Sequence, residues 1–162
     1  MLIRTGIPEK EQIDEVFPEQ DRLEKGPCAV IECFQNIPCN PCASACRRNA
    51  IKPFENINNL PIIDRDKCNG CTICVSKCPG LAIMVVDYNY SDTQAVLKIP
   101  YEFLPLPHVG EVVDGLDREG KSVCKAEVVK VLNTKAMDKT PVISIAVPKE
   151  FIKVVRNIGM GV

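Results

Sequence analysis

The sequence predicts an α+β protein: a cysteine-rich unit with pseudo-twofold symmetry, followed by a small antiparallel β-barrel or β-sandwich module. Two observations support this prediction. Nine of the ten cysteines lie between residues 28 and 78, and the two halves of that stretch align at a constant shift of 32 residues without gaps. From about residue 94 onward the chain is rich in valine and isoleucine and is divided by Pro, Gly and Asp. That composition is typical of short strands joined by turns.

The repeat aligns three cysteines of the first half with three of the second. The aligned pairs are Cys39 with Cys71, Cys42 with Cys74, and Cys46 with Cys78. The apolar residues around them align as well, with Ile31 on Ile63 and Ile51 on Ile83. Each half is therefore predicted to form a short strand, a cysteine-rich loop, a brief helix and a return to strand.

We divide the chain into an N-terminal arm (1–27), the cysteine-rich unit (28–92) and the β-module (93–162). In the arm, Pro8 and the acidic residues after it predict a short helix over 8–17, which Pro18 ends. Residues 29–32 carry a strand signal directly before the cysteines.

The β-module is predicted to contain about five short strands. Residues 126–131 and 142–147 have the Val/Ile-rich pattern of strands, and "DGLDREGK" has the pattern of a hairpin turn. A closing helix is predicted over 148–158, because Pro148 starts the segment and its apolar residues share one helical face.

Composition excludes several classes of function. A net charge of −1 gives no general case for binding nucleic acid. No apolar run approaches the roughly 20 residues of a membrane helix, and the N-terminus lacks the order of a signal peptide. We therefore expect a cytoplasmic protein without membrane insertion, in which ten cysteines indicate metal binding rather than disulfides.

The tightest cysteine spacing predicts the kind of metal. Residues 68–79 read "CNGCTICVSKCP", with two, two and three residues between successive cysteines. Three thiolates this close do not suit one tetrahedral zinc ion in its usual paired geometry. They can instead converge on three corners of a cubane while the fourth cysteine points toward the neighbouring loop. The spacing favours a 4Fe–4S cluster over zinc.

Residues 28–88 thus resemble the bacterial-type ferredoxin fold with two 4Fe–4S clusters. The resemblance implies that one cluster is bound by Cys68, Cys71, Cys74 and Cys46. It implies that the second cluster is bound by Cys39, Cys42, Cys78 and a further ligand.

That further ligand is uncertain in the sequence, because Asn36 stands where the repeat would place a cysteine. Cys33 is favoured, since it follows the predicted strand at the mouth of the loop. Cys28 lies before the strand, roughly 13 Å of extended chain further back, and would reach the cluster only if the strand broke. Asn36 itself, water, or a three-iron cluster stay open as alternatives. Cys28 and Cys124 are then expected to be small buried hydrophobic residues.

No catalytic site is predicted on this chain. It has no glycine-rich nucleotide motif, and its single histidine, His108, has no nucleophile or carboxylate pair near it in sequence. The wording "GPCAVIECFQNIPCNPC" is similar to small iron–sulfur subunits of heteromeric flavin-dependent dehydrogenases of the proline, hydroxyproline and sarcosine type. This resemblance implies an electron-transfer subunit that relays single electrons between a partner flavoprotein and a further acceptor.

Two other functions stay open. One is a freely diffusing ferredoxin carrier with an appended β-domain, which would call for a strongly acidic surface that a net charge of −1 does not favour. The other is a structural or sensory protein, although two adjacent clusters suit conduction better than structure.

Overall fold

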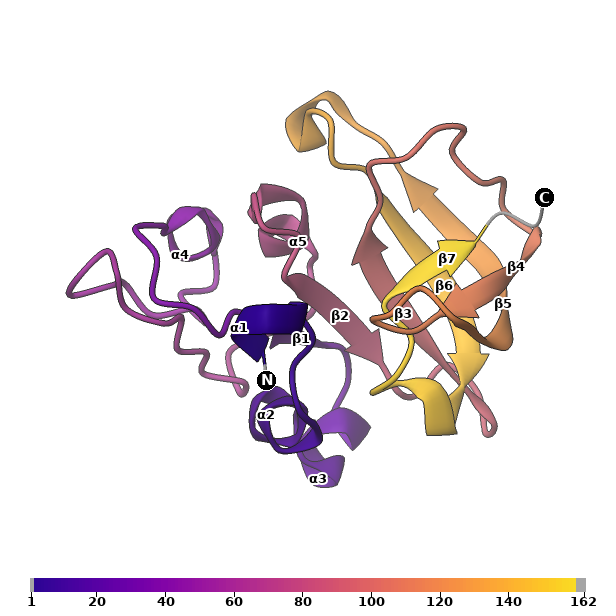
Figure 1. The fold of residues 1–162 in the computed structure, drawn as a ribbon, viewed down its shortest axis with the longest axis horizontal. Helices are drawn as coiled ribbons and strands as arrows, with labels where there is room; N and C mark the ends of the chain where they lie inside the picture. The colour runs from indigo at the N-terminus through magenta and orange to yellow at the C-terminus, as the bar shows by residue number, and fades with distance from the viewer. Residues whose placement is uncertain (1, 160–162) are drawn as a thin grey trace.

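A computed structural model describes residues 2–159, and its strands form one antiparallel sheet with the order β1-β2-β3-β6-β5-β4-β7 (Figure 1). The strands are β1 (Cys28–Ile31), β2 (Ile83–Asp87), β3 (Gln94–Pro100), β4 (Val112–Leu116), β5 (Ser122–Leu132), β6 (Val142–Pro148) and β7 (Asn157–Gly159). The helices are α1 (Leu2–Thr5), α2 (Lys10–Val16), α3 (Gln20–Glu24), α4 (Pro41–Ala45) and α5 (Ile73–Lys77), with 3-10 turns η1 (Lys135–Met137) and η2 (Lys149–Phe151). No helix in the described part of the chain has both the length and the apolar character that crossing a membrane requires.

The cysteine-rich unit has the internal symmetry that the repeat predicts. Helices α4 and α5 are equally long and begin 32 residues apart. Ile31 pairs with Ile83 where β1 meets β2, and the isolated bridge between Ile51 and Ile63 is its counterpart under the same shift. The two cysteine-bearing loops therefore leave and rejoin equivalent pairs of extended segments.

The strands beyond residue 93 correct the expectation of a barrel or sandwich. They extend the sheet of the cysteine-rich unit, since Val85, Val86 and Asp87 of β2 pair with β3. Within residues 2–159 the sheet is not closed, because β1 and β7 are its two ends. Burial explains this continuity: Val85 and Val86 are fully buried, so the backbone of β2 needs a hydrogen-bonding partner on each side. The division of the chain at 92/93 stays a prediction, and Met1 and residues 160–162 lie outside the described residues.

Several predicted elements are confirmed, and one is wrong. The arm helix is α2, the predicted strands lie in β1, β5 and β6, and residues 117–120 form the turn between β4 and β5. The closing helix is wrong: η2 makes a single turn, and β7 then pairs with β4. The edge of β4 offers backbone partners to this segment, whose Val155 and Ile158 are buried against the sheet, so strand pairing overrides the helical pattern.

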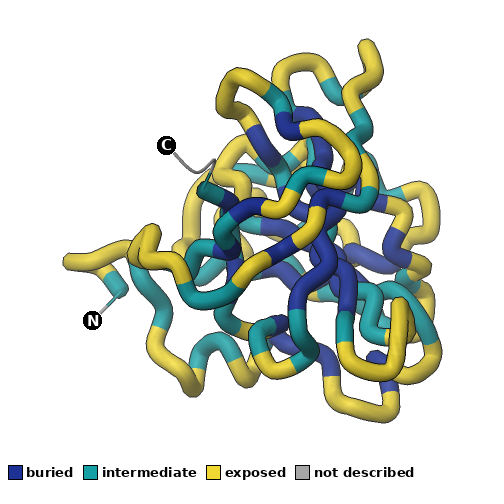
Figure 2. The backbone as a smooth tube through the Cα atoms, turned by 90° about the vertical axis from the view of Figure 1, so that its right-hand side faces the viewer, coloured by how far each residue is buried: buried dark blue, intermediate teal, exposed yellow. Residues whose placement is uncertain are grey.

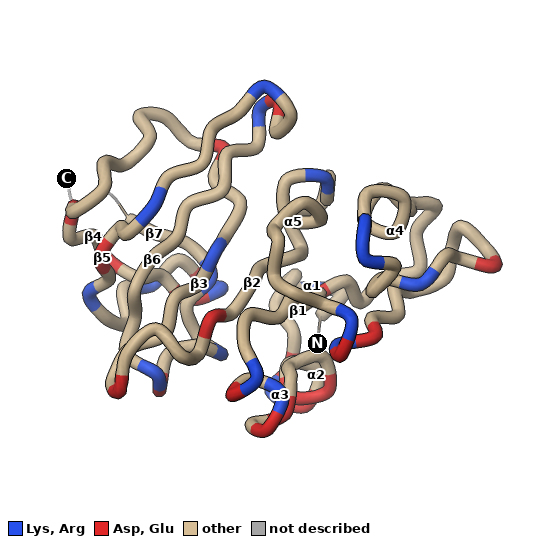
Figure 3. The backbone as a smooth tube through the Cα atoms, turned by 180° about the vertical axis from the view of Figure 1, so that it is seen from behind, with Lys and Arg blue, Asp and Glu red and all other residues tan. Residues whose placement is uncertain are grey.

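The N-terminal arm packs against the cysteine-rich end of the sheet. Phe17 and Leu23 are buried in the same cluster as Val30 of β1 and Met84 of β2. Buried residues concentrate in the interior of the sheet region (Figure 2), whereas α2 and α3 carry most of the arm's carboxylates on the surface (Figure 3). The arm thus covers the sheet next to the loops that carry the cysteines.

Candidate metal centres

Two small cavities lie beside the two cysteine loops, and four cysteines line each of them. The first cavity is lined by Cys33, Cys39, Cys42 and Cys78. The second is lined by Cys46, Cys68, Cys71 and Cys74. These are the two sets of four that the sequence resemblance predicts, brought together by the fold. Ligation of a cluster by each set stays a prediction.

Each helix contributes to both sets. Cys42 lies within α4 and Cys46 directly after it, while Cys74 lies within α5 and Cys78 directly after it. Because the chain leaves each helix in an extended conformation, the last cysteine points away from its own loop and joins the other set. This is the crossed arrangement typical of two-cluster ferredoxins.

The donor set and its surroundings fit iron–sulfur clusters. Within residues 2–159, no three Cys, His, Asp or Glu side chains converge closely enough to hold a single metal ion. Each set of four thiols surrounds a space instead, as thiolates that bind separate iron atoms of one cluster do. Backbone N–H groups also donate to the sulfurs of Cys68 (3.3 Å), Cys46 (3.5 Å) and Cys78 (3.4 Å). Such bonds are one way in which a protein tunes a cluster.

Cys33 is placed where the sequence favours it, and the alternatives lie elsewhere. Cys33 follows β1 and lines the first cavity with Cys39 and Cys78. The side chain of Asn36 instead donates a hydrogen bond to the backbone oxygen of Asn58 (3.0 Å), and Asn36 is not among the residues that line this cavity. The structure thus supplies a fourth sulfur without any break in β1.

Cys28 is more than the small buried hydrophobic residue that we expect from the sequence. It is fully buried at the start of β1, where its thiol donates to the backbone oxygen of Ala29 (3.6 Å) and interacts with Cys68, a member of the second set. The interaction between the two sulfurs is the main reason why the pKa of Cys68 is lowered to about 5 and the pKa of Cys28 is raised. Cys28 therefore contacts the set that does not contain Cys33.

Cys74 is the most buried thiol of the second set. Burial, followed by the charges of neighbouring cysteines, raises its pKa to about 12. Since a cysteine binds metal as a thiolate, loading of this set must release a proton from Cys74.

No pattern in the sequence pointed to Arg22, the residue that connects the Cys68 loop to the arm. This buried side chain donates to the backbone oxygens of Cys68 (2.7 Å), Arg65 (2.7 Å), Gly26 (3.0 Å) and Pro27 (3.3 Å). Its partners are carbonyl groups, which every residue carries, so no pairing of residue types could have revealed it.

A buried ion-pair cluster holds the residue next to Cys33. Glu32 accepts hydrogen bonds from Arg118 (3.0 and 2.6 Å) and from Arg156 (2.7 Å to Nε, with Nη2 also in contact). Burial disfavours the ionised form of Glu32, but the hydrogen bonds and charges of the two arginines outweigh it and lower the pKa of Glu32. The entry to the Cys33 loop is therefore anchored to β-module residues from 86 and 124 positions further along the chain.

Gly70 sets the path of the loop between Cys68 and Cys71. Its φ of +67° is favourable only for glycine, and a Cβ there would lie 2.5 Å from the Cβ of Pro27. We expect Gly70→Ala to lose about 1–3 kcal/mol of unfolding free energy beyond the backbone strain, measured by urea denaturation under anaerobic conditions.

Gly120→Ala is the matched control for this prediction. Gly120 has a similar φ of +79°, but nothing lies within 4 Å of a Cβ built there. It therefore has the backbone strain without the collision. Equal losses of stability in the two variants would contradict the packing role of Gly70.

Comparison with known proteins identifies part of this region. A family model described as a 4Fe-4S binding domain matches residues 61–84, which contain Cys68, Cys71, Cys74 and Cys78. Over 61 residues the chain is 33% identical to the ferredoxin-type protein NapF of Haemophilus influenzae. This alignment covers 36% of the chain and 35% of the relative, so the chain spans about a third of that protein's length. No solved structure matches the chain. The chain thus carries a 4Fe–4S binding domain.

Proposed function

We propose that this chain is the electron-transfer subunit of an oxidoreductase complex and holds two 4Fe–4S clusters. One observation carries the proposal: the fold gathers two sets of four cysteines into neighbouring cavities. When bound, such clusters supply one-electron transfer. The family match at residues 61–84 supports cluster binding by the second half of the repeat.

In this proposal the chain's own residues hold the clusters and shield them from water. The cysteine sulfurs would bind the iron atoms, and backbone N–H groups donate hydrogen bonds to three of these sulfurs. Ile51, Val75 and Ile83 are buried in one apolar cluster with Cys42 and Cys74, and this cluster keeps water away from those two cysteines. The location in this proposal is the cytoplasm, where cysteines stay reduced and available as cluster ligands.

The partner in this proposal is a flavin-containing dehydrogenase of amino acids of the proline, hydroxyproline or sarcosine type. The amino-acid sequence of residues 26–42 supports this partner. The N-terminal arm and the β-module, which flank the cysteine-rich unit, support a role in a complex, because a diffusible carrier needs neither segment. The likeness to a ferredoxin-type protein also supports a second candidate, a freely diffusing ferredoxin carrier with an appended β-domain.

Cluster number and partner are tested on protein purified anaerobically from its native host. We expect about eight iron atoms and eight acid-labile sulfides per chain. We also expect one equivalent of a polypeptide that carries the absorbance spectrum of a flavin to co-elute with the chain. About four iron atoms per chain would overturn the proposal of two clusters. A chain that elutes as a monomer without a flavoprotein would favour the diffusible carrier.

A further inference from the structure

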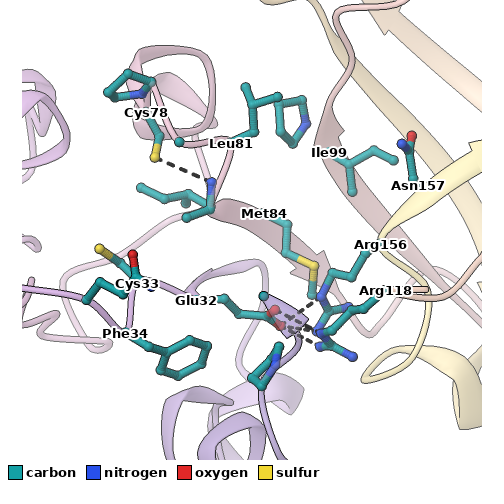
Figure 4. A pocket seen from close by; sticks show the side chains of 18 of the residues that line it. Glu32, Cys33, Phe34, Cys78, Leu81, Met84, Ile99, Arg118, Arg156 and Asn157 are labelled. Atoms are coloured by element: carbon teal, nitrogen blue, oxygen red, sulfur yellow. Dashed lines mark hydrogen bonds and ion pairs between the residues drawn. The ribbon is translucent and has the colours of Figure 1, made fainter. Parts of the chain in front are cut away.

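A third and much larger pocket, of about 820 Å³, lies between the cysteine-rich unit and the β-module (Figure 4). Cys33, Cys39 and Cys78 of the first set line one side of it, and Arg118 and Arg156 line another. Its volume is within the roughly 300–1,000 Å³ of pockets that bind small molecules, which often lie between modules. A cluster held by these three cysteines would take up part of this space, and none of the functions considered above uses the rest.

Arg118 presents unused hydrogen-bond donors to the pocket. Arg118 has five N–H groups, and residues that the structure describes accept from three of them. Two positive guanidinium groups also face a single carboxylate, that of Glu32, so these three side chains together carry one excess positive charge. A ligand oxygen with lone pairs or partial negative charge would be favoured here.

The remaining walls are mostly apolar. Met84 and Ile99 line the pocket and are buried, while Leu81 and Phe103 line it with 41% and 62% of their surface exposed. Such walls suit a flat apolar body, and large exposed apolar side chains beside a pocket often mark a binding site.

We propose that this pocket binds a planar conjugated ring with carbonyl oxygens, the chemistry that quinones and isoalloxazine rings share. The ring would lie between the apolar walls, and one of its carbonyl oxygens would accept hydrogen bonds from the unused N–H groups of Arg118. Its redox character rests on the proposed function, because three predicted cluster ligands line the pocket. The binding site itself rests only on the shape and polarity of the pocket.

Carboxylates in the pocket lining discriminate among such ligands. Glu102, Asp117 and Glu119 line the pocket, and the first and last of these are exposed. Their carboxylates would repel a phosphate group outside the ring. Riboflavin is therefore expected to bind at least as tightly as FMN, although both carry the same ring.

The test is equilibrium dialysis of the iron-loaded full-length chain against riboflavin, FMN and menadione in turn. We expect one site per chain for at least one ring, and retention of riboflavin or of menadione identifies the ring type. No retention of any of the three at ligand concentrations up to about 100 µM, where a Kd near 1 µM would give saturation, overturns the proposal. FMN binding tenfold tighter than riboflavin would overturn the placement of the ring oxygen on Arg118.

Phe103→Glu and Val109→Glu form a matched pair. Both positions are exposed, to 62% and 65%, and lie in the connection between β3 and β4, but Val109 does not line the pocket. We expect Phe103→Glu to weaken ring binding at least tenfold and Val109→Glu to leave it unchanged, both with unchanged iron content. Equal binding by the two variants would contradict the site, whereas a chain with about eight irons and no ring binding would leave the proposed function standing.

Discussion

Replacing Cys33 with serine is expected to halve the iron content of the chain, from about eight to about four atoms, because one of two clusters loses a ligand. Cys33 shares its cavity with Cys39, Cys42 and Cys78, and Asn36 does not line that cavity. The second set contains none of these four sulfurs. Iron analysis with electron paramagnetic resonance of the reduced protein would show loss of one cluster signal and retention of the other.

Cys28→Ser is the control for this prediction. Cys28 interacts with Cys68 of the second set and lines neither cavity, so the variant should keep about eight irons. Its effect should be confined to the signal of the cluster that the second set holds, since a changed neighbour of a ligand sulfur alters the cluster's electronic environment. A Cys28→Ser protein with four irons, beside a Cys33→Ser protein with eight, would refute the ligand assignment.

Glu32→Ala is expected to lose about 3–5 kcal/mol of unfolding free energy, because two buried guanidinium groups would be left without their carboxylate. The side chains of Glu32, Arg118 and Arg156 are each only 13–14% exposed, so water can replace the lost partner only in part. The anchor of the Cys33 loop would be lost as well, so iron content should fall. Urea denaturation and iron analysis of the same samples measure both effects.

The contribution of Glu32 to the free energy of unfolding should also depend on pH. Its pKa is lowered in the folded protein from the ordinary value of 4.5, so its contribution is fully present above that pH. The contribution is lost as the pH falls through the lower, folded-state pKa. The difference in stability between wild type and Glu32→Ala should therefore shrink in acid and stay constant near neutrality.

Asp14→Asn supplies the comparison for an exposed pair. Asp14 and Lys153 form an ion pair at 2.6 Å with side chains 42% and 46% exposed. Because exposed pairs contribute little, the midpoint of unfolding should not change. If Glu32→Ala behaved like Asp14→Asn, the buried cluster would not be what anchors the Cys33 loop.

The local parts of this fold could be predicted from the sequence. The spacing of cysteines along one short loop determines which sulfurs lie close together, and the 32-residue shift reproduces the bounds of α4 and α5. The arm helix and the turn at 117–120 also follow from residues adjacent in the chain. These features depend on backbone preferences and side-chain spacing within about a dozen residues, which a single sequence displays.

The tertiary structure decided the features that depend on contacts between residues far apart in the sequence. The 148–158 segment pairs as a strand because the edge of β4 is beside it, and the expected barrel is an extension of the β1–β2 sheet because β2 is buried and needs β3. Cys28 contacts Cys68, and Glu32 contacts Arg118 and Arg156, across 40 to 124 residues of sequence. The spacing along the sequence thus determined three neighbouring cysteines of each set, whereas the fourth, Cys78 or Cys46, comes from the other half of the repeat and followed from the resemblance to ferredoxins. The anchor beside Cys33 and the pocket next to it needed the folded chain, because burial and long-range pairing have no local signature.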